Sequence, residues 1–156
     1  MPGVKQQDRL GRSVDLFAIA VGSAIASLGS LALVALARHT WGTPADTGPT
    51  AAALADATHD WYAAGAGVCI GCAVATVLSR RGPIWNGLIS GGLACLLVLT
   101  PAFILTLPED VTSDEKPGFV PFVLLGLVPF ALVGTLLGAL LRAALPNRRG
   151  GAPVAS

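Results

Sequence analysis

The chain has 156 residues, of which 53% are hydrophobic and only 12% are charged. A soluble domain carries about 25% charged residues, so this composition excludes an ordinary soluble fold and indicates a chain whose solvent is mostly lipid. The net charge of +1 provides no basic field, so we expect no nucleic-acid partner.

Four apolar segments are long enough to cross a bilayer, whose hydrocarbon core of about 30 Å needs about 20 helical residues. Backbone amides in lipid must be paired within their own segment, and the alternation typical of a barrel strand is absent, so we expect helices. The sequence predicts spans over residues 14–37, 62–79, 84–107 and 119–141. The expected fold is an all-α membrane protein, a four-helix transmembrane bundle with antiparallel neighbours, with residues 14–141 as its transmembrane domain.

The first span follows an N-terminal segment, residues 1–13, that we expect in the cytoplasm. Asp15 stands at the start of the span, where a carboxylate is favoured by the free amides of a helix N-terminus. The alternative is a cleavable signal peptide, which would leave three spans. The apolar run from Leu16 to Ala37 exceeds the usual core of about 7 to 15 residues, so we expect the first span to be retained.

The next two spans carry their own start signals. The second is the shortest, and the alanine-rich stretch Ala51–Asp60 after Thr50 predicts a helix that begins outside the membrane. Gly82 and Pro83 predict a tight turn followed by the start of the third helix. Pro101, inside the third span, interrupts helical hydrogen bonding.

The charged residues predict both termini in the cytoplasm, because Lys and Arg concentrate on that side of a membrane protein. Eight of the ten basic residues fall on the side of the termini, and they are Lys5, Arg9, Arg12, Arg80, Arg81, Arg142, Arg148 and Arg149. The other side carries Arg38, Lys116 and seven of the nine acidic residues. High Ala, Gly, Arg and Leu usage is typical of a GC-rich bacterial genome, so we expect a multi-pass protein of the plasma (inner) membrane. Residues 142–156 are expected to form a disordered cytoplasmic tail.

Small residues recur at helical spacing in every span, where they allow close approach of helix backbones in lipid. The predicted helix-packing residues are Gly22, Ala26, Gly67, Gly71, Gly87, Gly91, Gly134 and Gly138. One interpretation is that they pack the four helices together. The other is that one of these faces is left over for a partner.

The three cysteines lie inside apolar segments rather than in loops, so a disulfide framework is not expected. Cys69 and Cys72 are three residues apart and share a helix face, and Cys95 lies at similar depth in the next span. Three converging thiols would bind a soft metal ion such as Cu(I) or Hg(II). The alternatives are plain packing, for which cysteine is a good small apolar residue, and redox chemistry.

A second metal hypothesis concerns the opposite side, where Asp56, His59 and Asp60 share a helical face and His39 ends the first span. Imidazoles and a carboxylate suit zinc, although polar side chains are also expected in a solvated loop. No ionisable residue lies at mid-depth in a span, which argues against an ion-coupled transporter. No nucleophile motif, phosphate loop or catalytic acidic pair is present, so we expect neither an enzyme nor a bound cofactor.

These patterns support two functional hypotheses. The first is a non-catalytic accessory or assembly subunit that acts through helix-to-helix contacts with a membrane-protein partner or with further copies of itself. The alternative is a small transporter or channel, whose substrate could be a soft metal ion bound by Cys69, Cys72 and Cys95.

Overall fold

The computed structural model describes residues 14–40, 49–106 and 120–145, in which all regular structure is helical. The elements are α2 (Leu16–Thr40), α3 (Pro49–Leu78), α4 (Pro83–Ala94), the π-helix η1 (Cys95–Leu99), α5 (Thr100–Thr106) and α6 (Val120–Ala144). Four helical stretches are long and apolar enough to cross a membrane, namely Leu16–Thr40, Thr58–Leu78, Pro83–Leu105 and Val123–Ala144. The expected helical class is therefore confirmed, as is the presence of four helical stretches long and apolar enough to span a membrane.

Segments 1–13 and 146–156, for which a cytoplasmic location was predicted, lie outside the described residues. The second and last helices are longer than the apolar runs that predicted them. The second helix begins at Pro49, so the alanine-rich stretch extends it as predicted. The last helix continues to Ala144, three residues beyond the predicted end of its span at residue 141.

The turn between α3 and α4 depends on Gly82 and Pro83. Gly82 has φ 57° and ψ 48°, the left-handed conformation that glycine adopts without the steric cost of a Cβ atom. Pro83 then stands in the first turn of α4, where its missing N–H would have no intrahelical acceptor. These two residues reverse the chain within the few positions that separate the second and third spans.

The third span is interrupted by η1, which the sequence did not predict. The amide of Thr100 donates to the carbonyl of Cys95, five residues back, instead of to the usual acceptor four residues back. Pro101 follows directly, and a proline ring collides with the carbonyl four residues before it, here that of Leu97. The wider turn gives the ring room, so the helix absorbs the proline as a π-segment.

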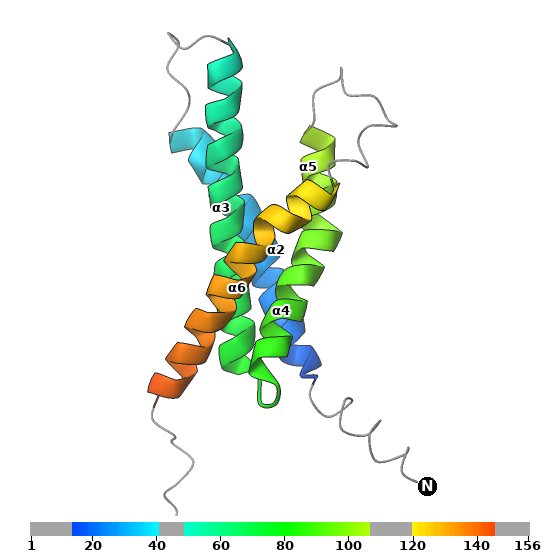
Figure 1. Ribbon diagram of the computed structural model, residues 1–156, viewed down its shortest axis with the longest axis vertical. Helices are drawn as coiled ribbons and strands as arrows, with labels where there is room; N and C mark the ends of the chain where they lie inside the picture. Colours follow the sequence, from blue (N-terminus) through cyan, green and yellow to red (C-terminus); the bar gives the residue numbers. More distant parts are fainter. Residues whose placement is uncertain (1–13, 41–48, 107–119, 146–156) are drawn as a thin grey trace, which may run out of the picture.

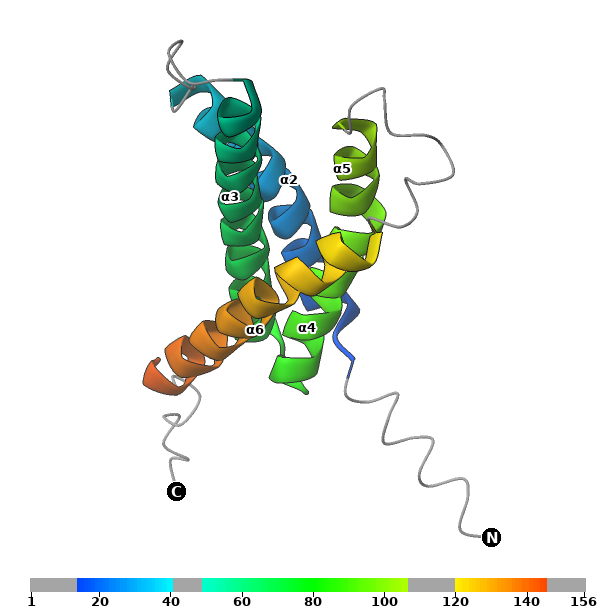
Figure 2. The same ribbon diagram turned by 45° about the horizontal axis from the view of Figure 1, so that its top comes forward.

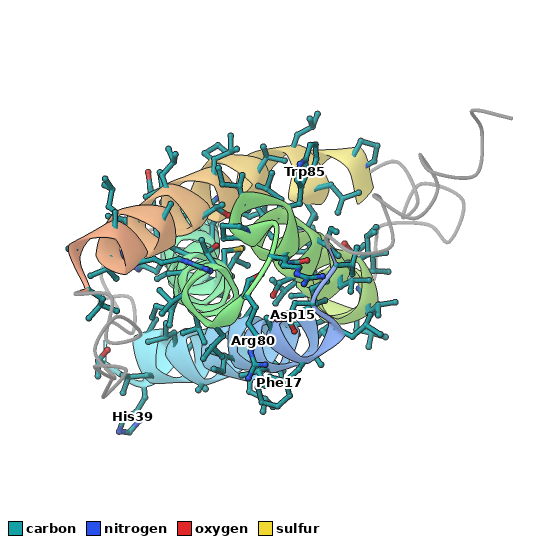
Figure 3. All side chains as sticks on the ribbon, turned by 90° about the horizontal axis from the view of Figure 1, so that it is seen from below. Asp15, Phe17, His39, Arg80 and Trp85 are labelled. Carbon is teal, nitrogen blue, oxygen red and sulfur yellow. The ribbon has the colours of Figure 1, made fainter. Side chains whose placement is uncertain are left out.

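The helices form three layers around α3. This helix packs against α2, α4 and α6, whereas α2 and α6 make no extended contact with each other in the described part of the chain. Figure 1 shows α3 and α4 side by side, and Figure 2 shows the same pair from a second angle. In the view along the helices, α2 and α6 lie on opposite sides of this pair (Figure 3). The spans therefore build a layered bundle in which α3 is the central helix.

The apolar core lies between α3, the third span and α6. Its buried members are Val68, Cys72, Cys95, Leu99, Val123, Leu127 and Ala131. Trp61 and Phe103 close this cluster with their rings edge to face, at a centroid distance of 6.4 Å. Most large apolar side chains outside the cluster, such as Leu97, Leu125 and Leu140, are exposed on the outer surface, as expected where lipid is the solvent.

Candidate functional site

The small residues of α2 and α3 lie face to face. A Cβ atom added to Gly71 would stand 2.5 Å from the Cβ and 2.6 Å from the amide nitrogen of Ala26. One added to Gly22 would stand 2.5 Å from the Cβ of Ala75, and one on Gly67 would overlap the backbone of Ser30. These distances leave no space for a side chain, so the two backbones touch along this seam.

The glycines of α4 and α6 also face α3. A Cβ atom on Gly91 would lie 2.5 Å from the sulfur of Cys72, and one on Gly87 would overlap the hydroxyl of Thr76. On α6, Gly138 lies against the main chain of Ala73, and Gly134 against the main chain of Cys69. All eight predicted packing residues thus lie in contacts within the chain, and none of them is on a face left over for a partner.

Hydroxyl groups add hydrogen bonds across the same seams. Ser23 donates to the carbonyl of Ser90 at 3.1 Å and joins α2 to α4. Ser30 donates to the carbonyl of Ala64 at 2.8 Å and joins α2 to α3. Hydrogen bonds of this kind contribute on average about 0.6 kcal/mol between membrane helices, so they supplement the close backbone packing.

A network of polar residues, which we call the polar clasp, joins four helix ends at the lower end of Figure 1. The clasp consists of Asp15, Ser79, Asn86, Arg142 and the main chain of Arg80 and Arg81. Its centre is Asn86, whose side chain is fully buried. The Asn86 amide nitrogen donates to the Ser79 hydroxyl and to the carbonyl of Arg81, and its oxygen accepts from the amide of Asp15.

The charged members of the clasp bind main-chain groups. Asp15 accepts from the amide of Arg80 at 3.1 Å and from the amide of Ala18 at 3.2 Å. These two hydrogen bonds, in that order, hold the pKa of the Asp15 carboxyl below its ordinary value of 3.8. Arg142 of α6 donates to the carbonyl of Ser79 and, at 3.4 Å, to that of Thr76. The clasp therefore satisfies carbonyls at the end of α3, where a cation is also favoured by the helix dipole.

The cysteines are divided between two environments, and all three are free thiols. Cys72 and Cys95 belong to the buried core cluster, whereas Cys69 is half-buried and lies outside that cluster. In residues 14–40, 49–106 and 120–145, no three His, Cys, Asp or Glu side chains are gathered so that they could hold a metal ion. The structure therefore places Cys72 and Cys95 in one buried cluster with Cys69 outside it, and the three predicted ligands do not form a metal site in the described residues.

The second predicted metal cluster is also separated. The guanidinium of Arg38 binds both carboxylate oxygens of Asp60, with its Nε atom 2.9 Å from Oδ2, so this carboxylate has a partner. His39 is exposed and points away from the helices (Figure 3). His59 is half-buried, and the side chain of Asp56 lies outside the described part of the structure. The Arg38 and Asp60 pair instead joins the end of α2 to α3.

Asn86, the centre of the polar clasp, is not among the residues predicted from the sequence. It is the only amide side chain between Gln7 and Asn147, and it stands inside a span. A polar side chain in a membrane helix costs free energy unless it is hydrogen-bonded, so an isolated amide in a span indicates a contact with another helix.

Comparison of the chain with models of protein families, with curated protein sequences and with solved structures found no match.

Proposed function

We propose that the chain is a small multi-pass protein of the plasma membrane that acts without catalysis, as an accessory or assembly subunit of another membrane protein. One observation carries the proposal. The eight packing residues and the hydroxyls of Ser23 and Ser30 serve contacts within the chain, so its interior is committed to holding the helices together. A protein with such an interior offers its outer surface for interaction.

The proposed topology has antiparallel neighbours and both termini in the cytoplasm. It is supported by the polar clasp, whose hydrogen bonds gather the start of α2, the end of α3, the start of α4 and the end of α6. That end carries Arg80, Arg81 and Arg142, and arginine is enriched on the cytoplasmic side. At the opposite end, Arg38 is paired with Asp60.

The two outer layers offer different surfaces to a partner. The outward face of α6 carries large exposed side chains such as Leu132 and Leu136, which suit lipid tails. The outward face of α2 also carries large exposed side chains such as Phe17 and Leu28, but between them lie the small exposed residues Ala20, Ala24 and Ala32. Small side chains let a second helix approach closely, so we propose that one transmembrane helix of a partner protein packs on α2.

The proposal is tested by photo-crosslinking in native membranes. A photoreactive side chain replaces Ala24 on α2 in one variant and Leu136 on α6 in the other, which is the matched control. We expect one protein adduct from position 24, lipid adducts alone from position 136, and lower abundance of the captured protein in cells that lack this chain. Lipid adducts alone at both positions, together with a monomer in mild detergent, would overturn the proposal. An adduct of twice the chain's own mass would replace the subunit role with self-association.

The second candidate function is transport of a soft metal ion. The observation that favours it is the shared buried cluster of Cys72 and Cys95, since two thiolates can bind Cu(I). Thiol labelling of the purified protein with a membrane-permeant reagent tests this role. Protection of both cysteines by Cu(I) or Hg(II), with Cys69 still labelled, would support transport. Equal labelling with and without the metal would remove the metal hypothesis.

A further inference from the structure

The turn between α3 and α4 carries two adjacent arginines whose backbone is fixed while their side chains are exposed. The amide of Arg80 donates to Asp15, and the carbonyl of Arg81 accepts from Asn86 and from the hydroxyl of Ser79 at 2.7 Å. Both arginine residues are exposed. The clasp thus holds the base of two long cationic side chains in place and leaves their guanidinium groups at the surface.

These guanidinium groups have no protein partner in the described part of the chain. Asp15 binds the main chain of Arg80, and the ion pair that the structure gives joins Arg38 and Asp60 at the other end. The carboxylate of Asp15 lies close enough to Arg80 to feel its charge, but it makes no ion pair with it. Two exposed arginines on neighbouring residues suit a phosphate, which accepts several hydrogen bonds from guanidinium groups.

The surroundings of the turn indicate which phosphate fits. Leu78 and Ile84 flank the two arginines along the chain and are 43% and 50% exposed, in helices apolar enough to span the membrane. Trp85, 66% exposed, is of the type that lies at the level of lipid headgroups, and it lies on the α6 side of the bundle, whereas Arg80 lies on the α2 side (Figure 3). A soluble phosphate uses only the cations, whereas a phospholipid places its phosphate on the arginines and its acyl chains on the apolar side chains.

We propose that the turn between α3 and α4 is a binding site for one anionic phospholipid, whose phosphate is held by Arg80 and Arg81. The site is preorganised by the polar clasp, and it does not depend on the accessory role proposed above. Each basic residue near a membrane surface contributes about 1 kcal/mol of attraction to anionic lipid, which corresponds to about a fivefold change in affinity. Loss of both arginines should therefore weaken binding about 25-fold.

The sequence offers a matched control for this test. Arg148 and Arg149 form a second adjacent pair on the same predicted side of the membrane, outside the described residues. The full-length protein in a mild neutral detergent is titrated with short-chain phosphatidylglycerol, phosphatidylcholine or inorganic phosphate. Native mass spectrometry counts the retained lipids, and circular dichroism checks that each variant is helical. Three proteins are compared: the natural chain, Arg80→Gln/Arg81→Gln and Arg148→Gln/Arg149→Gln.

We expect the natural chain to retain one phosphatidylglycerol in preference to phosphatidylcholine. The Arg80→Gln/Arg81→Gln variant should lose this preference, and the control pair should keep it. An equal loss in both variants would overturn the proposal, because it would show diffuse attraction rather than a site. Competition by inorganic phosphate at the same concentration as the lipid would also overturn it, since the acyl chains would then contribute nothing.

Discussion

Asp15 and Arg80 are joined across 65 positions of sequence by a hydrogen bond from the Arg80 amide to the Asp15 carboxylate. The other oxygen of the same carboxylate accepts from the amide of Ala18 and caps the first turn of α2. One side chain therefore satisfies a helix end and fixes the turn after α3. This double role ties the position of the first span to the reversal between the second and third.

We expect the stability contributed by Asp15 to depend on pH. The carboxyl pKa is lowered in the folded state, so the contribution is complete above the ordinary value of 3.8 and is lost as the pH falls through the lower folded value. The Asp15→Asn variant should melt at a lower temperature than the natural chain at pH 7. The difference should stay constant down to about pH 4 and shrink below it.

Thermal melts in detergent over this pH range provide the measurement. The control is Asp8→Asn, which makes the same change of charge in the segment before the described residues. A constant difference between Asp15→Asn and the natural chain down to pH values well below 3.8 would contradict the assignment of the pH dependence to this carboxyl.

We expect Asn86 to contribute more than any single buried hydroxyl. The Asn86→Ala variant leaves the part-buried amide of Asp15 without its acceptor and removes the donor to the buried Ser79 hydroxyl, while the carbonyl of Arg81 keeps its hydrogen bond from Ser79. Such loss costs about 2–3 kcal/mol of unfolding free energy in total. The control is Ser23→Ala, which removes the hydrogen bond to Ser90 and should cost about 0.6 kcal/mol. Unfolding in mixed micelles measures both, and equal losses would show that Asn86 is not the centre of the clasp.

Much of the fold follows from local sequence. The spans are predictable because a membrane crossing demands a long apolar run, and the extension of α3 is predictable because its alanine-rich stretch favours helix in water too. The turn at Gly82 is also predictable from the sequence, because glycine followed by proline restricts the backbone to a few conformations. Each of these features is determined by the residues of one short segment.

The rest depends on contacts between segments. Pro101 predicts a disturbed helix, but the sequence does not decide between a kink and the π-segment that the structure has. The layered order of α2, α3 with α4, and α6 depends on which glycine meets which backbone, and every span carries glycines that could serve. For the same reason, the burial of Cys72 and Cys95 in one cluster, with Cys69 outside it, could not be predicted from their spacing.

We expect the glycines of one chain to differ sharply in their tolerance of a methyl group. The Gly71→Ala variant would force apart α2 and α3, because the new Cβ atom would meet the Cβ and amide nitrogen of Ala26. Overpacking of this kind costs about 1–3 kcal/mol. The control is Gly92→Ala, whose Cβ atom meets nothing within 4 Å. It should leave stability unchanged or raise it by up to about 1 kcal/mol, because alanine is the better helix former. Equal effects on unfolding in mixed micelles would contradict the close contact of α2 with α3.

The last prediction concerns Trp61, which fills the space between α3, α5 and α6. Its ring lies on Gly126 and edge to face with Phe103, so a Cβ atom at position 126 would overlap the indole. In a Trp41→Phe/Trp85→Phe background, fluorescence reports on Trp61 alone. We expect Gly126→Ala to shift the emission to longer wavelength, because the displaced indole leaves the apolar cluster for the polar headgroup region, and to cost about 1–3 kcal/mol of stability. Gly92→Ala in the same background should change neither quantity. Unchanged emission in Gly126→Ala would mean that the indole does not lie on α6, and another residue would then have to join α3 to α5 and α6.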